Sequence, residues 1–144
     1  MKKIHLLACV MFLPVIFLAC ASSYTELEVG MSYTESLQYL PETAKSFDVY
    51  TCFTQGDENI VVEYDGLFEK IVQIRSFDAV FPSEEDFSKV TPQMSFLEVV
   101  EQVGIPKRSV TFGISSTDFE SAEGTYFRII WDSQMKVYDV SKLD

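Results

Sequence analysis

Hydrophobic residues recur along the chain with two different spacings, one typical of helices and one typical of strands. Intervals of three and four residues occur in two stretches and predict helices that bury one face. The apolar positions are Tyr33, Leu37 and Leu40 in the first stretch and Phe96, Val99, Val100 and Val103 in the second. Both predicted helices are short, so they need packing against other elements to be stable.

Each helical stretch begins with the same motif, a Met-Ser pair with a glutamate three residues after the serine. Ser32 and Glu35 start the first copy, and Ser95 and Glu98 start the second. In such a capping box the serine hydroxyl accepts a bond from the glutamate backbone N–H, and the glutamate side chain accepts one from the serine N–H. The motif predicts where both helices begin, and the proline or glycine after each stripe predicts where they end.

Runs rich in β-branched and aromatic residues follow each predicted helix and indicate strands. The candidate strands cover residues 47–53, 60–64, 67–76, 109–114, 125–131 and 135–140. Asp65-Gly66 is a strong hairpin signal between two of them. Residues 82–87 predict a short helix start, and the polar, acidic residues 115–124 predict a mobile loop. The overall pattern is a helix followed by three antiparallel strands, and it occurs twice.

The two halves of this pattern match each other at a nearly constant offset. Met31 matches Met94 at an offset of 63 residues, and Tyr64 matches Trp131 at an offset of 67 residues. We interpret the match as an internal duplication. The predicted boundaries are residues 24–76 for repeat 1 and residues 77–144 for repeat 2.

These elements predict an α+β fold of two tandem helix-plus-three-strand antiparallel units, packed as a two-layer sandwich. In such an arrangement each sheet buries one face under the helices and leaves the other face open. The two repeats together would form one compact domain, since a chain of this size can bury about two-thirds of its unfolded surface.

The amino terminus has the features of an export signal. Two lysines precede an apolar run at residues 4–19, which predicts a secretory signal peptide over residues 1–19. Phe17-Leu18-Ala19-Cys20 resembles the lipobox of bacterial lipoproteins, with its leucine two residues before the cysteine rather than three. We therefore predict that Cys20 carries lipid, that residues 20–23 form a tether, and that the protein is anchored to a membrane of the cell envelope.

Two alternatives to this anchor follow from the same residues. Ala19-Cys20-Ala21 fits an ordinary secretion site, and cleavage after Ala21 would release a soluble form. An uncleaved apolar anchor is the other alternative. In the lipoprotein interpretation the protein faces the periplasm or the extracellular side, and the lipid bilayer is a partner through Cys20.

The chain is strongly acidic, with a formal net charge of −11. Removal of residues 1–19 takes away two lysines and no acids, which brings the charge to −13. Such a surface repels nucleic acid, so we predict no nucleic-acid partner. The charge either serves solubility alone or complements a basic patch on a partner.

Few residues offer chemistry for catalysis. The single histidine, His5, lies in the predicted signal, so the mature chain lacks histidine for acid–base work or metal binding. Cys52 has no internal cysteine partner once Cys9 and Cys20 are accounted for, so no disulfide is expected. The acids at residues 57–59 and 84–86 lack the spacing of a calcium loop. We predict no metal and no cofactor.

The predicted open sheet faces are the more promising place for function. We expect several aromatic, charged and polar side chains on the strand faces opposite the core, where they could bind another protein. The candidate residues are Tyr50, Glu63, Gln73, Arg75, Thr111, Tyr126 and Arg128. The sequence thus favours a non-catalytic adaptor or inhibitor-like module that binds another envelope protein. The alternative is a small-ligand binder or a carboxylate-based enzyme with a cleft between the two repeats.

A family resemblance supports this interpretation. Residues 30–35, and residues 94–100 running into Gly104-Ile105-Pro106, are similar to the motif of the small protein A family, which includes the E component of the outer-membrane β-barrel assembly machinery. A doubled version of that unit occurs in β-lactamase-inhibitor-protein-like folds. The chain departs from the pattern at Gln93, where glycine is expected, and at Leu40. The resemblance implies an α+β sandwich that works by binding proteins.

Overall fold

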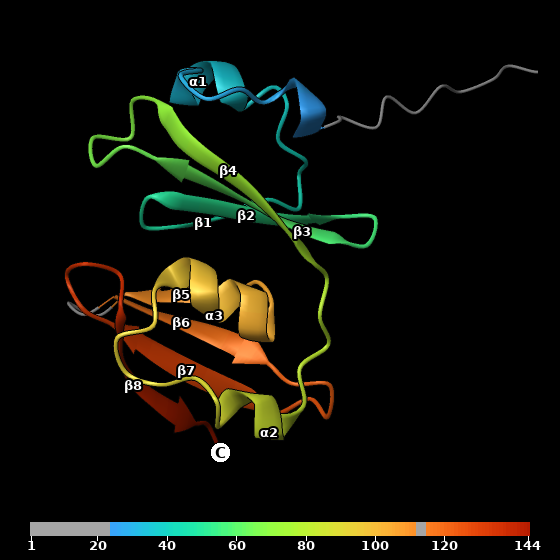
Figure 1. The fold of residues 1–144 in the computed structure, drawn as a ribbon, viewed down its shortest axis with the longest axis vertical. Helices are drawn as coiled ribbons and strands as arrows, with labels where there is room; N and C mark the ends of the chain where they lie inside the picture. The colour runs from blue at the N-terminus through green and yellow to red at the C-terminus, as the bar shows by residue number, and fades with distance from the viewer. Residues whose placement is uncertain (1–23, 112–114) are drawn as a thin grey trace, which may run out of the picture.

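The computed structural model describes residues 24–111 and 115–144. At Thr111 it describes the backbone alone. The fold is mostly β and contains two antiparallel sheets of four strands each (Figure 1). The predicted signal, the tether and Cys20 lie outside the described residues. Within residues 24–111 and 115–144, no helix is long and apolar enough to cross a membrane.

Each strand pairs with its neighbour in sequence, in the orders β1-β2-β3-β4 and β5-β6-β7-β8. The first sheet contains β1 (Lys45–Phe47), β2 (Tyr50–Gln55), β3 (Glu58–Tyr64) and β4 (Ile71–Asp78). The second contains β5 (Arg108–Thr111), β6 (Ser115–Glu120), β7 (Tyr126–Trp131) and β8 (Val137–Lys142). The helical segments are η1 (Tyr24–Glu26), α1 (Tyr33–Ser36), α2 (Glu84–Phe87) and α3 (Phe96–Val103).

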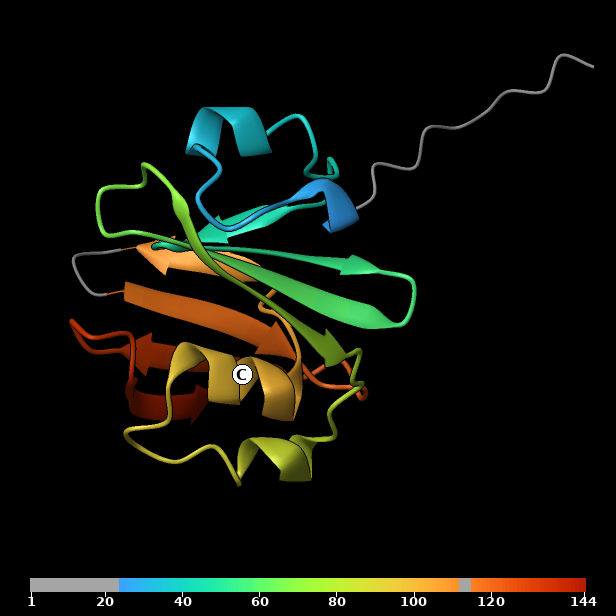
Figure 2. The ribbon, with the colours of Figure 1, turned by 45° about the horizontal axis from the view of Figure 1, so that its top comes forward.

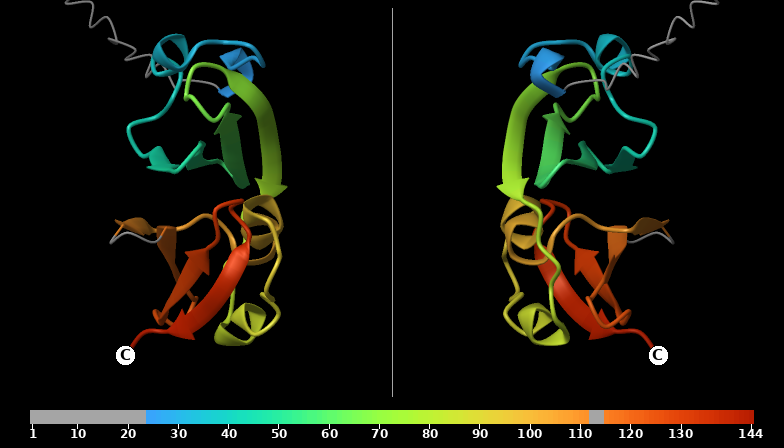
Figure 3. Two further views of the ribbon diagram at one scale, coloured as in Figure 1. Left: turned by 90° about the vertical axis from the view of Figure 1, so that its left-hand side faces the viewer. Right: turned by 90° about the vertical axis from the view of Figure 1, so that its right-hand side faces the viewer.

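Helix α3 lies between the two sheets and contributes to the core of both halves (Figures 1 and 3). Phe96 is fully buried, and its ring stacks on that of Tyr50 from the first sheet, with centroids 4.3 Å apart. On the other side Phe96 lies 5.3 Å from the ring of Trp131 in the second sheet. The larger hydrophobic cluster therefore joins β1, β2, α3 and the second sheet.

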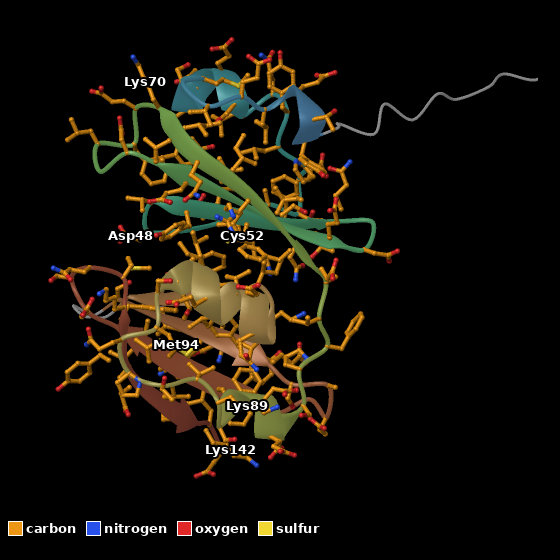
Figure 4. The ribbon with its side chains drawn as sticks, viewed as in Figure 1. Asp48, Cys52, Lys70, Lys89, Met94 and Lys142 are labelled. Atoms are coloured by element: carbon orange, nitrogen blue, oxygen red, sulfur yellow. The ribbon has the colours of Figure 1, made fainter. Side chains whose placement is uncertain are left out.

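The first sheet is covered on both faces, whereas the sequence predicted one open face. Ile60 and Val62 on β3 point to the side of η1 and α1, where they pack with Leu27. The alternate residue Val61 and its partner Cys52 point to α3 and belong to the larger cluster. Figure 2 shows η1 and α1 over one face of this sheet, and Figure 4 shows Cys52 on the side of α3.

The two predicted helices differ in length and in capping. Helix α3 ends at Gly104 and has the complete capping box, because Ser95 accepts a bond from the Glu98 backbone and Glu98 accepts one from the Ser95 N–H. Helix α1 was predicted to extend to Leu40, but it has four residues and ends at Ser36. Its cap consists of the single bond from the Glu35 N–H to the Ser32 hydroxyl, at 3.2 Å.

The predictions for two segments, residues 47–53 and residues 115–124, were wrong. Residues 47–53 form a hairpin rather than one strand, because Asp48 adopts a left-handed φ of 53° and turns β1 back onto β2. Residues 115–124 were predicted to be a loop, yet Ser115–Glu120 is the strand β6. This strand is mostly polar but buried, because the Thr117 hydroxyl accepts a bond from Trp131 Nε1 and Asp118 is covered by arginines.

The segments before α1 and α3 attach to the sheets through the same backbone contacts. Ser32 forms an isolated antiparallel bridge with Lys70, and Ser95 forms one with Lys136. Lys70 and Lys136 follow the turns of the β3–β4 and β7–β8 hairpins. Each of these turns contains a residue with left-handed φ, Phe68 in the first sheet and Met135 in the second. The ladder next to each hairpin also contains a register shift, at residues 63–64 and at residues 130–131.

Candidate functional site

Among residues 24–111 and 115–144, no helix or strand covers one face of the second sheet. Figures 1 and 3 show α2 and α3 on the same side of this sheet, where Phe127, Ile129 and Trp131 of β7 are buried. The alternate residues of β7 and their cross-strand neighbours point to the other side, which we call the open face. Its central residues are Arg108, Asp118, Glu120, Tyr126, Arg128 and Ile130.

A buried carboxylate holds two arginines at the centre of the open face. The three residues are direct cross-strand neighbours, because Arg108 on β5 and Arg128 on β7 both pair with Asp118 on β6. Arg128 donates from Nε and Nη2 to the two carboxylate oxygens at 2.7 and 3.0 Å. Arg108 donates from Nε at 2.5 Å. We call this group the Arg-Asp-Arg cluster.

The two guanidinium groups of the cluster are exposed to solvent, whereas its carboxylate is buried. The side chain of Asp118 is 0% exposed, while those of Arg108 and Arg128 are 58% and 32% exposed. Burial raises the pKa of Asp118, but the hydrogen bonds from Arg128 and Arg108 outweigh it and leave that pKa below its ordinary value. The hydrogen bond to Asp118 likewise raises the pKa of Arg128. Asp118 is therefore ionised at neutral pH, and because two arginine guanidinium groups surround one carboxylate, the cluster has a local excess of one positive charge.

An aromatic ring and an ion pair flank the cluster. The Arg108 guanidinium lies 5.4 Å from the centroid of the Tyr126 ring, which is within the range of a cation–π contact. Tyr126 pairs across the ladder with Glu120, whose carboxylate lies 3.8 Å from Lys107 Nζ. Planar, polar groups held in fixed positions are suited to contact another protein surface, where tyrosine and arginine contribute most of the binding energy.

Three of the seven predicted site residues lie in the second sheet. Tyr126 and Arg128 point to the open face, as the alternation in β7 predicts. Thr111 belongs to β5 and pairs with Ser115, but its side chain is outside the described part of the structure. The structure thus brings Tyr126 and Arg128 together on β7, where Arg128 binds Asp118 and Arg108 lies over the Tyr126 ring.

The other four predicted residues lie on the face of the first sheet that points to α3, so their assignment to an open face was wrong. Tyr50 is buried under Phe96, and burial followed by the charges of Glu63 and Asp48 raises its pKa to about 12. Burial also raises the pKa of the half-buried Glu63. Gln73, half-buried, pairs with Glu63. The fourth residue, Arg75, is exposed, 5.7 Å from the Phe77 ring.

Sequence reasoning missed Arg108 and Asp118. Both were overlooked because residues 115–124 were predicted to be a loop, which left Arg108 without a strand partner. A signal was present, because Ser116, Asp118 and Glu120 alternate with Thr117 and Phe119 as outward and inward positions of a strand do. Phe119 is the one apolar residue of this strand, so hydrophobic spacing did not reveal it.

A hollow of about 310 Å³ lies between the two sheets, where the sequence had suggested a cleft. Glu120 is the one carboxylate among its described lining residues, and it pairs with Lys107. A neighbouring hollow of about 360 Å³ contains Asp78 and Glu101, both exposed to solvent. In the described residues no group of three or more acidic, cysteine or histidine side chains is placed to hold a metal ion.

Comparisons with known proteins give no family for this chain. No family model, no curated protein and no solved structure matches it. The resemblance to the small protein A family therefore stays a prediction. The function has to be argued from the geometry of the described residues.

Proposed function

We propose that the protein is a non-catalytic binding module that contacts another protein of the bacterial cell envelope through the open face of its second sheet. The observation that carries the proposal is the Arg-Asp-Arg cluster beside Tyr126. In this arrangement two guanidinium groups are fixed in position before any partner arrives.

Fixed side chains favour binding because less conformational freedom is lost when a partner docks. Asp118 restricts both arginines at the same time, and the stacking of Arg108 near Tyr126 restricts that ring as well. The partner class is a folded protein, because tyrosine and arginine side chains on an exposed sheet face are typical of protein–protein interfaces.

We further propose that the module is a duplicated unit, with residues 24–76 and 77–144 as its two repeats. The paired isolated bridges, the paired left-handed residues Phe68 and Met135, and the paired register shifts support this division. Each unit has a fourth strand beyond the three that the sequence predicts. Lipid at Cys20 would hold the module at a membrane, and mass spectrometry of the protein from its native envelope tests that part separately.

The test of the binding proposal is an affinity purification with two arginine variants. Arg108→Ala removes an exposed guanidinium that contacts an aromatic ring on the open face, and Arg75→Ala removes a similar one from the first sheet. We expect Arg108→Ala and Tyr126→Ala to reduce recovery of the envelope partner by about tenfold, as loss of a hot-spot side chain does. Arg75→Ala should leave recovery unchanged.

Thermal unfolding of the same variants separates binding from folding. Arg108→Ala removes one of the three hydrogen bonds to the buried Asp118, so its melting temperature should fall by several degrees, while the two bonds from Arg128 should keep the variant folded at the temperature of the purification. Equal recovery of the partner by Arg108→Ala, Tyr126→Ala and the parent chain would refute the proposal. Equal loss with Arg75→Ala would place the binding surface elsewhere.

The alternative of a carboxylate-based enzyme receives less support. Such chemistry uses two carboxylates with different environments close to one bound substrate. The hollow between the sheets contributes Glu120 alone, while Asp78 and Glu101 are solvent-exposed in the neighbouring hollow. The binding module is therefore the function that the described geometry favours.

A further inference from the structure

The hollow between the two sheets contains a polar group that the fold itself leaves unused. We propose that this hollow binds a small neutral amide, such as a peptide group that carries a short apolar side chain. The site is separate from the Arg-Asp-Arg cluster, and the proposal does not rest on the proposed function.

The hollow lies under the segment that leads from β4 to α2, and polar and apolar groups contribute about equally to its walls. Its size, about 310 Å³, is at the lower end of the range found for small-molecule sites. The apolar walls come from Val80, Pro82, Val103 and Ile105. The apolar residues can contact a short side chain, and the polar groups between them can orient a small ligand.

Asn59 supplies the central polar group. Its side chain is 4% exposed, and its Oδ1 accepts a hydrogen bond from the Thr54 hydroxyl at 2.8 Å. Its Nδ2 has no hydrogen-bond partner among the described residues. Every fully enclosed side-chain nitrogen and oxygen in the described ranges does have a partner, so Nδ2 must border the open space of the hollow. Two amide hydrogens are thus directed at a place where a ligand oxygen can sit.

Gly104 makes room for this amide. It adopts a left-handed φ of 78°, and a Cβ at this position would lie 3.6 Å from Asn59 Nδ2 and 3.4 Å from Val80. A side chain here would therefore be strained and would also fill the wall of the hollow. Glycine at the end of α3 both terminates the helix and keeps the space beside Nδ2 open.

The remaining polar groups select a neutral amide over a charged ligand. The buried Ser121 hydroxyl accepts from the Thr125 N–H at 3.2 Å, which leaves its own hydrogen to donate. Lys107 and Glu120 bring opposite charges to the same hollow, 3.8 Å apart. A charged ligand would be attracted by one member of this ion pair and repelled by the other, so the pair gives little net preference for either charge. An amide offers a carbonyl to the donors and an N–H to Glu120.

Selective labelling makes this proposal testable on the full chain. Asn59 is the single asparagine in the sequence, so ¹⁵N-asparagine labelling gives one side-chain NH₂ signal in an NMR spectrum. The probe is N-acetylvaline N-methylamide, with pentanoate and pentylamine as charged comparisons. A neutral probe of about twelve heavy atoms should shift the Asn59 NH₂ signal saturably, with a Kd in the low millimolar range.

A matched pair of variants tests the role of the amide. Thr54→Val removes the hydroxyl that fixes Asn59 Oδ1, at an exposed position where the fold tolerates the change, and should raise the Kd about fivefold. Thr34→Val, on exposed α1, should leave the Kd unchanged. The proposal is overturned if the neutral probe leaves the Asn59 NH₂ signal unchanged at concentrations well above the expected Kd. It is also overturned if the charged probes shift this signal equally, or if Thr54→Val binds the neutral probe with the Kd of the parent chain.

Discussion

At the scale of single residues, Asp118 is the side chain on which the open face depends. It is fully buried, yet it is charged, because three hydrogen bonds from two arginines replace the water that it loses. Replacing it removes stabilisation from the sheet and frees both guanidinium groups. The same residue therefore contributes to stability and to the geometry of the proposed binding surface.

The expected result of Asp118→Asn is a loss of about 1–3 kcal/mol of unfolding free energy at neutral pH, from the weakened charged hydrogen bonds. Because the folded-state pKa of Asp118 is lowered, its contribution is present above the unfolded value of about 3.9 and is lost as the pH falls through the folded pKa. The stability gap between parent and variant should therefore narrow below about pH 4.

Urea unfolding from pH 7 down to pH 3 measures this gap, with Asp139→Asn as the control. Asp139 is an exposed acid on β8, an edge strand of the same sheet, and its replacement should change stability by less than about 0.5 kcal/mol. A gap that stays constant over the whole pH range would show that the charge of Asp118 does not stabilise the sheet.

At the scale of secondary-structure elements, the two copies of the capping motif begin helices that differ in length and in burial. Helix α3 carries the complete box and buries Phe96, Val99, Val100 and Val103 between the sheets. Helix α1 has four residues, one capping bond and one buried residue, Ser36. The same sequence signal thus begins a core helix in one place and a single surface turn in the other.

Serine-to-alanine substitutions at the two caps should reveal this difference. Ser95→Ala removes the hydroxyl that accepts from the Glu98 N–H and donates to the Glu98 carboxylate, and it should cost about 1–2 kcal/mol of unfolding free energy. Ser32→Ala removes one bond from an exposed turn and should cost about 0.5 kcal/mol or less. Both values come from chemical denaturation of otherwise identical proteins. Equal costs at the two positions would contradict the unequal roles of the helices.

The elements also show how far the sequence predicts this fold. The capping motifs correctly marked the starts of α1 and α3, and alternation in β7 correctly placed Tyr126 and Arg128 on one face. The fourth strand of each sheet escaped prediction for local reasons. The turn at Asp48 uses a left-handed non-glycine residue, and β6 buries the polar Thr117 and Asp118 beside its one apolar residue, Phe119. The conformation of both segments depends on contacts with residues far away in the chain, and sequence spacing does not reveal those contacts.

The same local errors explain the misplaced site residues. With residues 47–53 taken as one strand, Phe47 and Phe53 share a face and Tyr50 points away from it. In the structure Phe47 and Tyr50 both face α3, and Phe53 faces the opposite cluster. The sequence also gave no indication that α3 would cover the first sheet, because that contact joins residues far apart in the chain.

At the scale of the whole molecule, the two sheets share a core through α3. Tyr50 and Phe47 of the first sheet belong to the same hydrophobic cluster as Phe96 and the inner face of the second sheet. If this cluster holds the halves together, neither sheet should unfold without the other. Small domains with one continuous core usually unfold in a single cooperative step.

Two natural probes, one in each half, test this cooperativity. Trp131 is the single tryptophan and lies in the second sheet, so its fluorescence reports that half. Cys52 is fully buried in the first sheet, and burial raises the pKa of its thiol, so it should react with a thiol reagent only after unfolding. In a chain with Cys9→Ser and Cys20→Ser, Cys52 is the sole thiol.

We expect the fluorescence of Trp131 and the reactivity of Cys52 to change at the same urea concentration. Phe96→Ala, which empties the space between the sheets, should lower both midpoints together and cost about 3–5 kcal/mol. Phe81→Ala is the matched control, because Phe81 is 89% exposed and should cost less than about 0.5 kcal/mol. Reaction of Cys52 at urea concentrations where Trp131 is still native would show that the first sheet opens alone, and α3 would then not join the two halves.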